Sequence, residues 1–186
     1  MRQHGPQMSE KEAEFARIVA THRRALLRYA LRRLDDHTDA EDLVAESLVV
    51  AWRRFSELPS REEEIYWLYG IAGRVLSNIV RGRQRSMRLE MRLAFERENE
   101  SDIQRYSEED VKQLMWALSQ VKAEERELLQ LTYWERLSYR EIGSVLGCTE
   151  RTAGVRISRA RQRLRELLNE SAPTATITHL PNQETL

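Results

Sequence analysis

The chain has 186 residues, of which 32% are charged and 41% hydrophobic, with only 7 Gly and 4 Pro. This composition favours helices and lacks the turn residues that an all-β fold needs. A single cysteine, Cys148, excludes an internal disulfide framework and a zinc site built on several thiolates. No apolar run approaches the roughly 18 residues of a membrane span, and no signal-peptide core follows Met1. We therefore expect a protein of the reducing cytoplasm without a membrane segment.

Positive and negative charges balance, with 30 Lys and Arg against 30 Asp and Glu, although a nucleic-acid-binding protein usually has a basic surplus. The charges are nevertheless segregated along the chain. Carboxylates gather at residues 35–46, 62–64 and 96–110, and arginines at 81–97 and 151–165. Because the Debye length in physiological salt is only about 8 Å, local charge decides what each surface binds. The pattern is compatible with two basic faces and one acidic face for another partner.

Helix starts are marked by a Ser or Thr followed three residues later by a carboxylate, the pattern of a capping box. The pairs are Ser9/Glu12, Thr38/Glu41, Ser60/Glu63, Ser107/Asp110 and Ser138/Glu141. Apolar residues follow each start at helical spacing. The first three starts predict a small helical bundle over residues 9–85, with Leu58-Pro59 separating its second and third helices.

The composition changes after this bundle. Residues 86–107 are mostly Arg, Glu, Asn, Ser and Asp, which predicts a flexible linker. Apolar periodicity returns over residues 108–170 and predicts a second helical domain. The last residues, 171–186, are rich in Thr, contain two prolines and show no periodicity, so we expect a disordered tail.

The strongest local pattern lies at residues 137–168. A short helix begins at Ser138 and ends before Gly147, which suits a left-handed C-terminal position, and Thr149 is a natural N-cap for the next helix. The inward positions of that next helix are Ala153, Ile157, Ala160 and Leu164. Two helices joined by so short a turn predict a helix-turn-helix, whose second helix enters the major groove of DNA. The predicted fold is thus all-α, with two small helical domains and a helix-turn-helix at the end of the second.

Outward residues of the second helix are the candidates for DNA contact. They are Thr149, Glu150, Arg151, Gly154, Val155, Arg156, Ser158 and Arg159. Arg151 is a candidate guanine reader, because bidentate pairing discriminates between bases by about 1–3 kcal/mol. Glu150 can accept a hydrogen bond from cytosine, and the later arginines are expected to meet phosphate. The alternative is a helical hairpin with a solvated arginine face.

Three blocks of the sequence resemble the sigma-70 family of bacterial RNA polymerase subunits. The first, DAEDLVAE at 39–46 with AWRRF at 51–55, resembles region 2.2. The second, WLYGIA at 67–72 with RGR at 81–83, resembles regions 2.3 and 2.4, and LSYREI at 137–142 with SRARQRL at 158–164 is similar to region 4.2. The order and separation of the blocks fit over about residues 12–170. With only these two domains, the chain resembles the compact extracytoplasmic-function (ECF) class.

The resemblance implies a sigma factor that binds the β and β′ subunits of core RNA polymerase, recognises the −35 and −10 promoter elements, and opens the duplex. The residues implied for polymerase binding are Asp39, Glu41, Asp42, Leu43 and Glu46. Those implied for −10 DNA are Ser56, Arg61, Tyr66, Arg74, Asn78, Arg81, Arg83 and Arg85, with the loop 56–61 capturing a flipped base and Tyr69 as a further aromatic candidate. The helix-turn-helix would read the −35 element. An anti-sigma protein is a further partner that the family implies.

Other classes of protein fit the sequence less well. An enzyme needs convergent catalytic groups or a phosphate loop, whereas the four histidines are scattered, so we expect no catalytic activity, cofactor or metal. A stand-alone transcription regulator would use the same helix-turn-helix without polymerase, but it leaves the arginine-rich third helix unexplained. A sigma-like protein that binds polymerase without melting DNA also stays open, because Gly73 and Asn78 stand where the family commonly has Arg and Asp.

Overall fold

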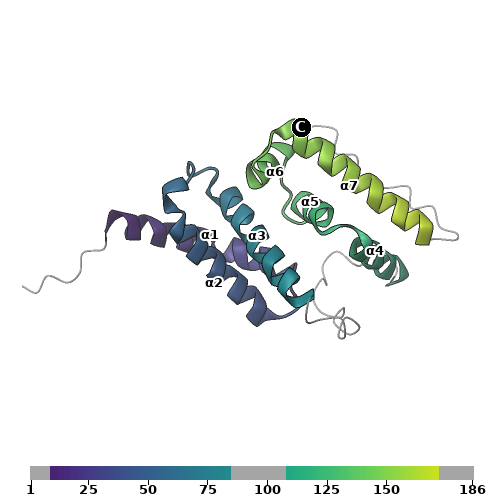
Figure 1. Cartoon of the computed structure of the whole chain (residues 1–186), viewed down its shortest axis with the longest axis horizontal. Coiled ribbons are helices and arrows are strands. Elements are labelled where there is room, and N and C mark those ends of the chain that lie inside the picture. Colours follow the sequence, from purple (N-terminus) through teal and green to yellow (C-terminus); the bar gives the residue numbers. More distant parts are fainter. Residues whose placement is uncertain (1–8, 85–107, 172–186) are drawn as a thin grey trace, which may run out of the picture. The chain divides into compact units, whose positions relative to one another are not determined.

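The computed structural model describes residues 9–84 and 108–171 (Figure 1). Every regular element within these two ranges is a helix, which confirms the predicted all-α fold. The helices group into two compact units. The first holds α1, α2, η1, α3, α6 and the start of α7 to Ala153, and the second holds α4, α5 and α7 from Gly154 onward. The predicted linker, 86–107, and the predicted tail beyond residue 171 lie outside the described residues.

Three long helices form the body of the first unit. They are α1 (Glu10–Leu31), α2 (His37–Arg53) and α3 (Glu64–Gln84), and the short 3-10 helix η1 (Phe55–Glu57) lies between the last two. Each of the three long helices contacts the other two. Their apolar stripes meet in a core whose largest fully buried members are Tyr29, Ile18, Leu26, Leu43, Leu68 and Ile71. The packing of amphipathic faces, rather than helix propensity alone, therefore stabilises the bundle.

Two of the predicted capping boxes are confirmed. At α1 and at α6 (Tyr139–Leu146), Ser9 and Ser138 accept from the backbone three residues on, and the Glu at that position bonds back to the cap. The box predicted at Thr38 is wrong. Asp36 caps α2 instead, since its Oδ1 accepts from the backbone N–H groups of Thr38 at 2.7 Å and Asp39 at 3.1 Å.

The remaining predicted starts have different outcomes. The box predicted at Ser60 is wrong, because a turn at residues 61–63 intervenes and α3 begins only at Glu64. Ser107 lies outside the described residues, immediately before the first residue of α4.

The second unit has a core of its own. It is built from α4 (Glu108–Gln120), α5 (Ala123–Tyr133) and the greater part of α7 (Glu150–Ser171). The buried residues that pack together are Ala117, Val121, Leu129, Ala160, Leu164 and Leu167. A hydrogen bond of 3.1 Å from the Gln113 side-chain amide to the Leu168 carbonyl joins α4 to α7.

The turn between α6 and α7 has the chemistry that the sequence predicts. Gly147 is left-handed, with φ 64°, and Thr149 Oγ1 accepts from the backbone N–H of Thr152 at 3.2 Å. Gly143 is needed for close approach, because a Cβ there would stand 2.7 Å from the Cys148 carbonyl oxygen. The four predicted inward positions of α7 are all buried. The helix-turn-helix is therefore formed.

We predict that alanine substitutions at two nearby positions on α7, one buried and one exposed, differ sharply in their effect on stability. Ile157 is 0% exposed and Val155 is 46% exposed. Ile157→Ala should lower the free energy of unfolding by about 2–5 kcal/mol, because it removes buried methyl groups and leaves a cavity. Val155→Ala should change it by less than about 0.5 kcal/mol. Urea denaturation followed by circular dichroism measures both, and equal losses would contradict the inward and outward assignment.

Candidate nucleic-acid interface

The first turns of α7 present cations and one apolar side chain to solvent. Arg151, Arg156 and Arg159 are exposed, as are Thr149, Glu150, Val155 and Ser158, whereas Gly154 is half-buried. Burial of Ala153, Ile157 and Ala160 on the opposite side fixes this orientation. Guanidinium groups bind guanine or phosphate, and an apolar side chain can contact a thymine methyl. The face predicted from the sequence is therefore assembled on one side of a single helix.

An acidic face lies on α2. Glu41, Asp42 and Glu46 are exposed, and Asp39 is half-buried. Leu43 is 0% exposed and belongs to the core, so the structure corrects its assignment as a contact residue. The exposed apolar residue is Val49, at 48%, which sequence reasoning missed. Its spacing of three from Glu46 and seven from Asp42 puts these residues on one face of the helix.

The loop before α3 and the outer side of α3 hold several of the predicted −10 contacts. Ser56, Arg61, Arg74 and Asn78 are exposed. Arg81 and Arg83 belong to α3, but their side chains lie outside what the structure describes, as does the whole of Arg85.

The aromatic candidates on α3 are less accessible. Tyr66 is half-buried and donates a hydrogen bond to the Glu141 carboxylate. Burial and this hydrogen bond raise the pKa of Tyr66 to about 12. Tyr69 is 6% exposed and stacks on Tyr29 with ring centroids 5.0 Å apart, so its suggested role in base stacking is wrong. Trp67 is half-buried.

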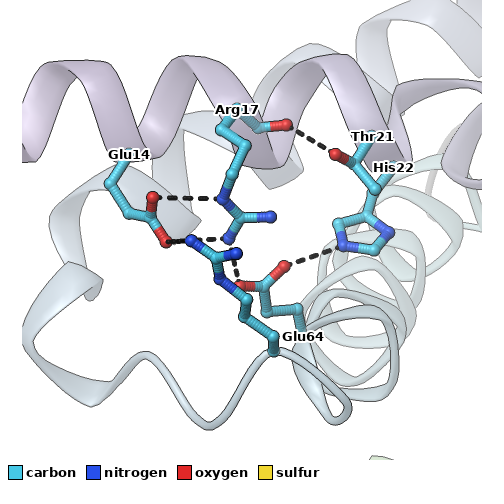
Figure 2. Close-up of polar contacts among 6 residues, drawn as sticks. Glu14, Arg17, Thr21, His22 and Glu64 are labelled. Atoms are coloured by element: carbon cyan, nitrogen blue, oxygen red, sulfur yellow. Dashed lines mark hydrogen bonds and ion pairs between the residues drawn. The ribbon is translucent and has the colours of Figure 1, made fainter.

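An ionic cluster around a buried carboxylate joins the start of α3 to α1 (Figure 2). Glu64, the first residue of α3, is 1% exposed, and Arg17 donates a short hydrogen bond to its Oε1. His22 Nε2 lies 2.9 Å from the other oxygen, Oε2. Arg17 also binds Glu14 through two hydrogen bonds, of 3.1 and 2.9 Å. Sequence reasoning missed the cluster, because Glu64 is more than 40 residues away from Arg17 and from His22.

The cluster keeps Glu64 ionised. Burial alone would raise the pKa of Glu64, but the hydrogen bonds from Arg17 and His22 outweigh it and hold the pKa below the ordinary value. An ionised carboxylate only accepts hydrogen bonds, so His22 must carry its proton on Nε2 to make this contact. Among residues 9–84 and 108–171, no group of His, Cys, Asp and Glu has the arrangement of a metal site. None of the described helices is long and apolar enough to span a membrane.

Two family models match the chain: Sigma-70 region 2 over residues 18–86, and Sigma-70, region 4 over residues 112–164. The RNA polymerase sigma-E factor of Streptomyces coelicolor is 31% identical over 157 residues, which cover 83% of this chain and 86% of the relative. The ECF RNA polymerase sigma factor SigL of Mycobacterium tuberculosis is 30% identical over 163 residues, covering 82% and 88%.

A solved structure agrees with these relatives. The sigma factor RpoE from Bartonella quintana, in complex with the anti-sigma factor NepR, is 26% identical and superposes with a TM-score of 0.59 over 86% of this chain and 99% of that one. The matches to regions 2 and 4 together define the class of protein as the sigma-70 family of RNA polymerase sigma factors. Within that family, the chain belongs to the ECF sigma factors. The stand-alone regulator is not favoured, and the regulatory role of sigma factors fits a protein that is not an enzyme.

We predict that Glu64 makes stability depend on pH in acid. Its pKa in the folded chain lies below 4.5, so the stabilisation is present above about pH 4.5 and is lost as the pH falls through the folded-state pKa. At pH 7, Glu64→Gln should be less stable than the wild type by about 1–3 kcal/mol, because the hydrogen bonds with Arg17 and His22 lose the negative charge of their acceptor. The difference should shrink as the pH falls below 4.5.

Urea denaturation at stepped pH measures this difference. Other carboxylates with lowered pKa values outside this cluster, such as Glu57 and Glu141, are present in both proteins and cancel in the comparison. Glu166→Gln, which removes an exposed ion pair with Arg163, is the control and should show a small difference at every pH. A difference in stability between wild type and Glu64→Gln that stays constant as the pH falls until the wild type unfolds would contradict the assignment.

Proposed function

We propose that this sigma factor reads the −35 element with the first turns of α7 and the −10 element with the outer side of α3 and the segment before it. This segment extends the predicted loop 56–61 to the start of α3 and includes the end of η1, and we call it the loop 56–63. The observation that carries the proposal is the presence of exposed arginines on both surfaces, Arg151, Arg156 and Arg159 on one and Arg61 and Arg74 on the other. Cations along a strand, beside a loop that can accept an unstacked base, are what duplex opening requires. The domains that we assign to these roles are residues 9–85 and 108–170, joined by 86–107 and followed by the tail 171–186.

The acidic face of α2 is the proposed docking surface for core polymerase. Asp42 and Glu46 lie on the same face of α2 as Val49, with Glu41 beside them, which gives an apolar contact next to a charged patch. This arrangement suits a basic surface on the β′ subunit. In the proposal Leu43 acts only from the core, where it sets the position of α2.

An anti-sigma protein is a proposed further partner. The solved relative from Bartonella quintana is bound to the anti-sigma factor NepR, and this supports a partner of the same kind here. Such a protein would compete with polymerase and DNA for the exposed faces of α2, α3 and α7. We place the action of the chain in the cytoplasm, with the polymerase.

Run-off transcription from a promoter library, with core polymerase in the presence and absence of this protein, tests the proposed function. We expect initiation that depends on the protein at templates sharing two sequence elements. Binding to core polymerase without transcription would replace the proposal with a sigma-like protein that does not melt DNA. Tight DNA binding without polymerase, together with no binding to core, would contradict both.

We predict that two arginines of α7 have different effects on promoter choice. Arg151→Ala should cost about 1–3 kcal/mol at a preferred −35 sequence and relax the preference at one base pair, because a base contact is lost. Arg159→Ala should weaken binding to all promoters about equally and reduce the salt dependence by about one ion, because a phosphate contact is lost. Holoenzyme binding to single-base promoter variants at several salt concentrations measures both.

The matched control is Lys122→Ala, which removes an exposed cation at the start of α5. It should leave both the base preference and the salt dependence unchanged. If Arg151→Ala and Arg159→Ala were indistinguishable from this control, α7 would not be the reading helix.

A further inference from the structure

The loop 56–63 is attached to α1 at its first end by aromatic contacts. Phe55, just before the loop, lies with its ring centroid 6.4 Å from that of Phe15 on α1 and 6.2 Å from that of Trp52 on α2. Phe15 and Trp52 meet edge to face at 5.1 Å. The ammonium of Lys11, also on α1, stands 4.2 Å from the Trp52 centroid and 5.4 Å from that of Phe55. Aromatic and cation–π contacts of this kind fix the start of the loop on α1.

The second end is attached to α1 by charge. Glu64 immediately follows the loop, and its two carboxylate oxygens are bound by Arg17 and His22, which lie one and a half turns apart on α1 (Figure 2). Within the loop, Arg61 lies 3.8 Å from Glu14, the residue that Arg17 also binds. The loop therefore has anchors at both ends and one along its length, and α1 contributes to every one of them.

We propose that Glu64 is a positioning residue for −10 recognition, which acts by holding the loop 56–63 on α1 and does not itself touch DNA. The proposal deepens the proposed function and rests on it. Capture of a base requires the contacting groups to be held within about 0.5 Å of their working geometry. A loop fixed at both ends before DNA arrives also loses less conformational freedom on binding.

The chemistry of the cluster favours positioning over simple stabilisation. A buried ion pair contributes little net stability compared with apolar residues of similar size, because desolvation offsets the attraction between the charges. It does impose direction, since each carboxylate oxygen of Glu64 has one donor at a defined place on α1. The ionised state of Glu64, which its lowered pKa indicates, keeps both oxygens as acceptors. The first turn of α3 and the residues before it are thereby held at one angle to α1.

The test compares Glu64→Leu with Glu64→Gln in holoenzyme with core polymerase. Leu has a similar size but no acceptor, whereas Gln accepts from Arg17 and can donate to the other tautomer of His22. Open-complex formation is measured by permanganate reactivity of unpaired thymines, on a promoter found in the run-off library and on versions with one −10 base changed. Wild type should discriminate roughly 5- to 150-fold against a changed base.

Glu64→Leu should lower this discrimination to about threefold or less, and Glu64→Gln should keep most of it. The affinity for core polymerase should not change in either variant, because Glu64 is buried away from the α2 face. Arg17→Gln, which removes the guanidinium that binds Glu64 and leaves His22 in place, is the second variant and should lower discrimination in the same way even if Glu64→Leu folds poorly. Glu166→Gln, which breaks an exposed ion pair on α7, is the control and should behave as wild type.

Two results would overturn the inference. One is full −10 discrimination in Glu64→Leu or Arg17→Gln. The other is an equal fall in open complexes on all promoters, which shows only a smaller folded fraction.

The loop variants Ser56→Ala and Arg61→Ala separate this inference from the proposed function. If they keep full discrimination, the loop is not the reader and the proposed function fails. If they lose it while Glu64→Leu keeps it, only the role of Glu64 fails.

Discussion

The packing of α1 against α3 in the first unit depends on a carboxylate with almost no access to water. Glu64 is 1% exposed, and an unpaired buried charge costs several kcal/mol or changes its protonation state. Arg17 and His22, both on α1, pair with this carboxylate. The position of α1 relative to α3 therefore depends on the side chain of Glu64. Buried apolar residues such as Ile18, Leu26, Leu68 and Ile71 supply the bulk of the core, but apolar packing tolerates small shifts that directional hydrogen bonds do not.

The helix-turn-helix depends on a different constraint, which is the space around the backbone. A left-handed residue is needed to end α6, and Gly147 provides it at φ 64° without a steric cost. One turn earlier, Gly143 lets the Cys148 carbonyl approach closely. With the turn fixed, burial of Ala153 and Ile157 determines which side of α7 faces solvent. The helical period then leaves Arg151, Arg156 and Arg159 on the part of the α7 surface that does not pack into the core.

Local patterns in the sequence predicted most of the helices and the helix-turn-helix, because each depends on residues within a few positions. The errors arise where several local solutions compete or where the partner is distant. Asp36 caps α2 in place of Thr38, because both are favourable N-cap residues only two positions apart and the helix begins at His37, after Asp36. Leu43 is assigned to polymerase by the family resemblance, and apolar residues on several sides of α2 leave the sequence unable to separate the buried Leu43 from the exposed Val49. The Glu64 cluster depends on α1 and α3 packing together, which no short window of sequence contains.

Balanced charge becomes an advantage once the two basic surfaces act as parts of one holoenzyme. In the proposed function each surface alone contacts only part of the promoter, so it meets fewer phosphates and binds more weakly at physiological salt than the two surfaces together. The acidic face of α2 further disfavours adsorption of the free protein to DNA. Attachment to polymerase turns the second DNA contact into an intramolecular event, which raises affinity without any new contact. A chain with zero net charge can therefore select promoters with polymerase and leave DNA largely free without it.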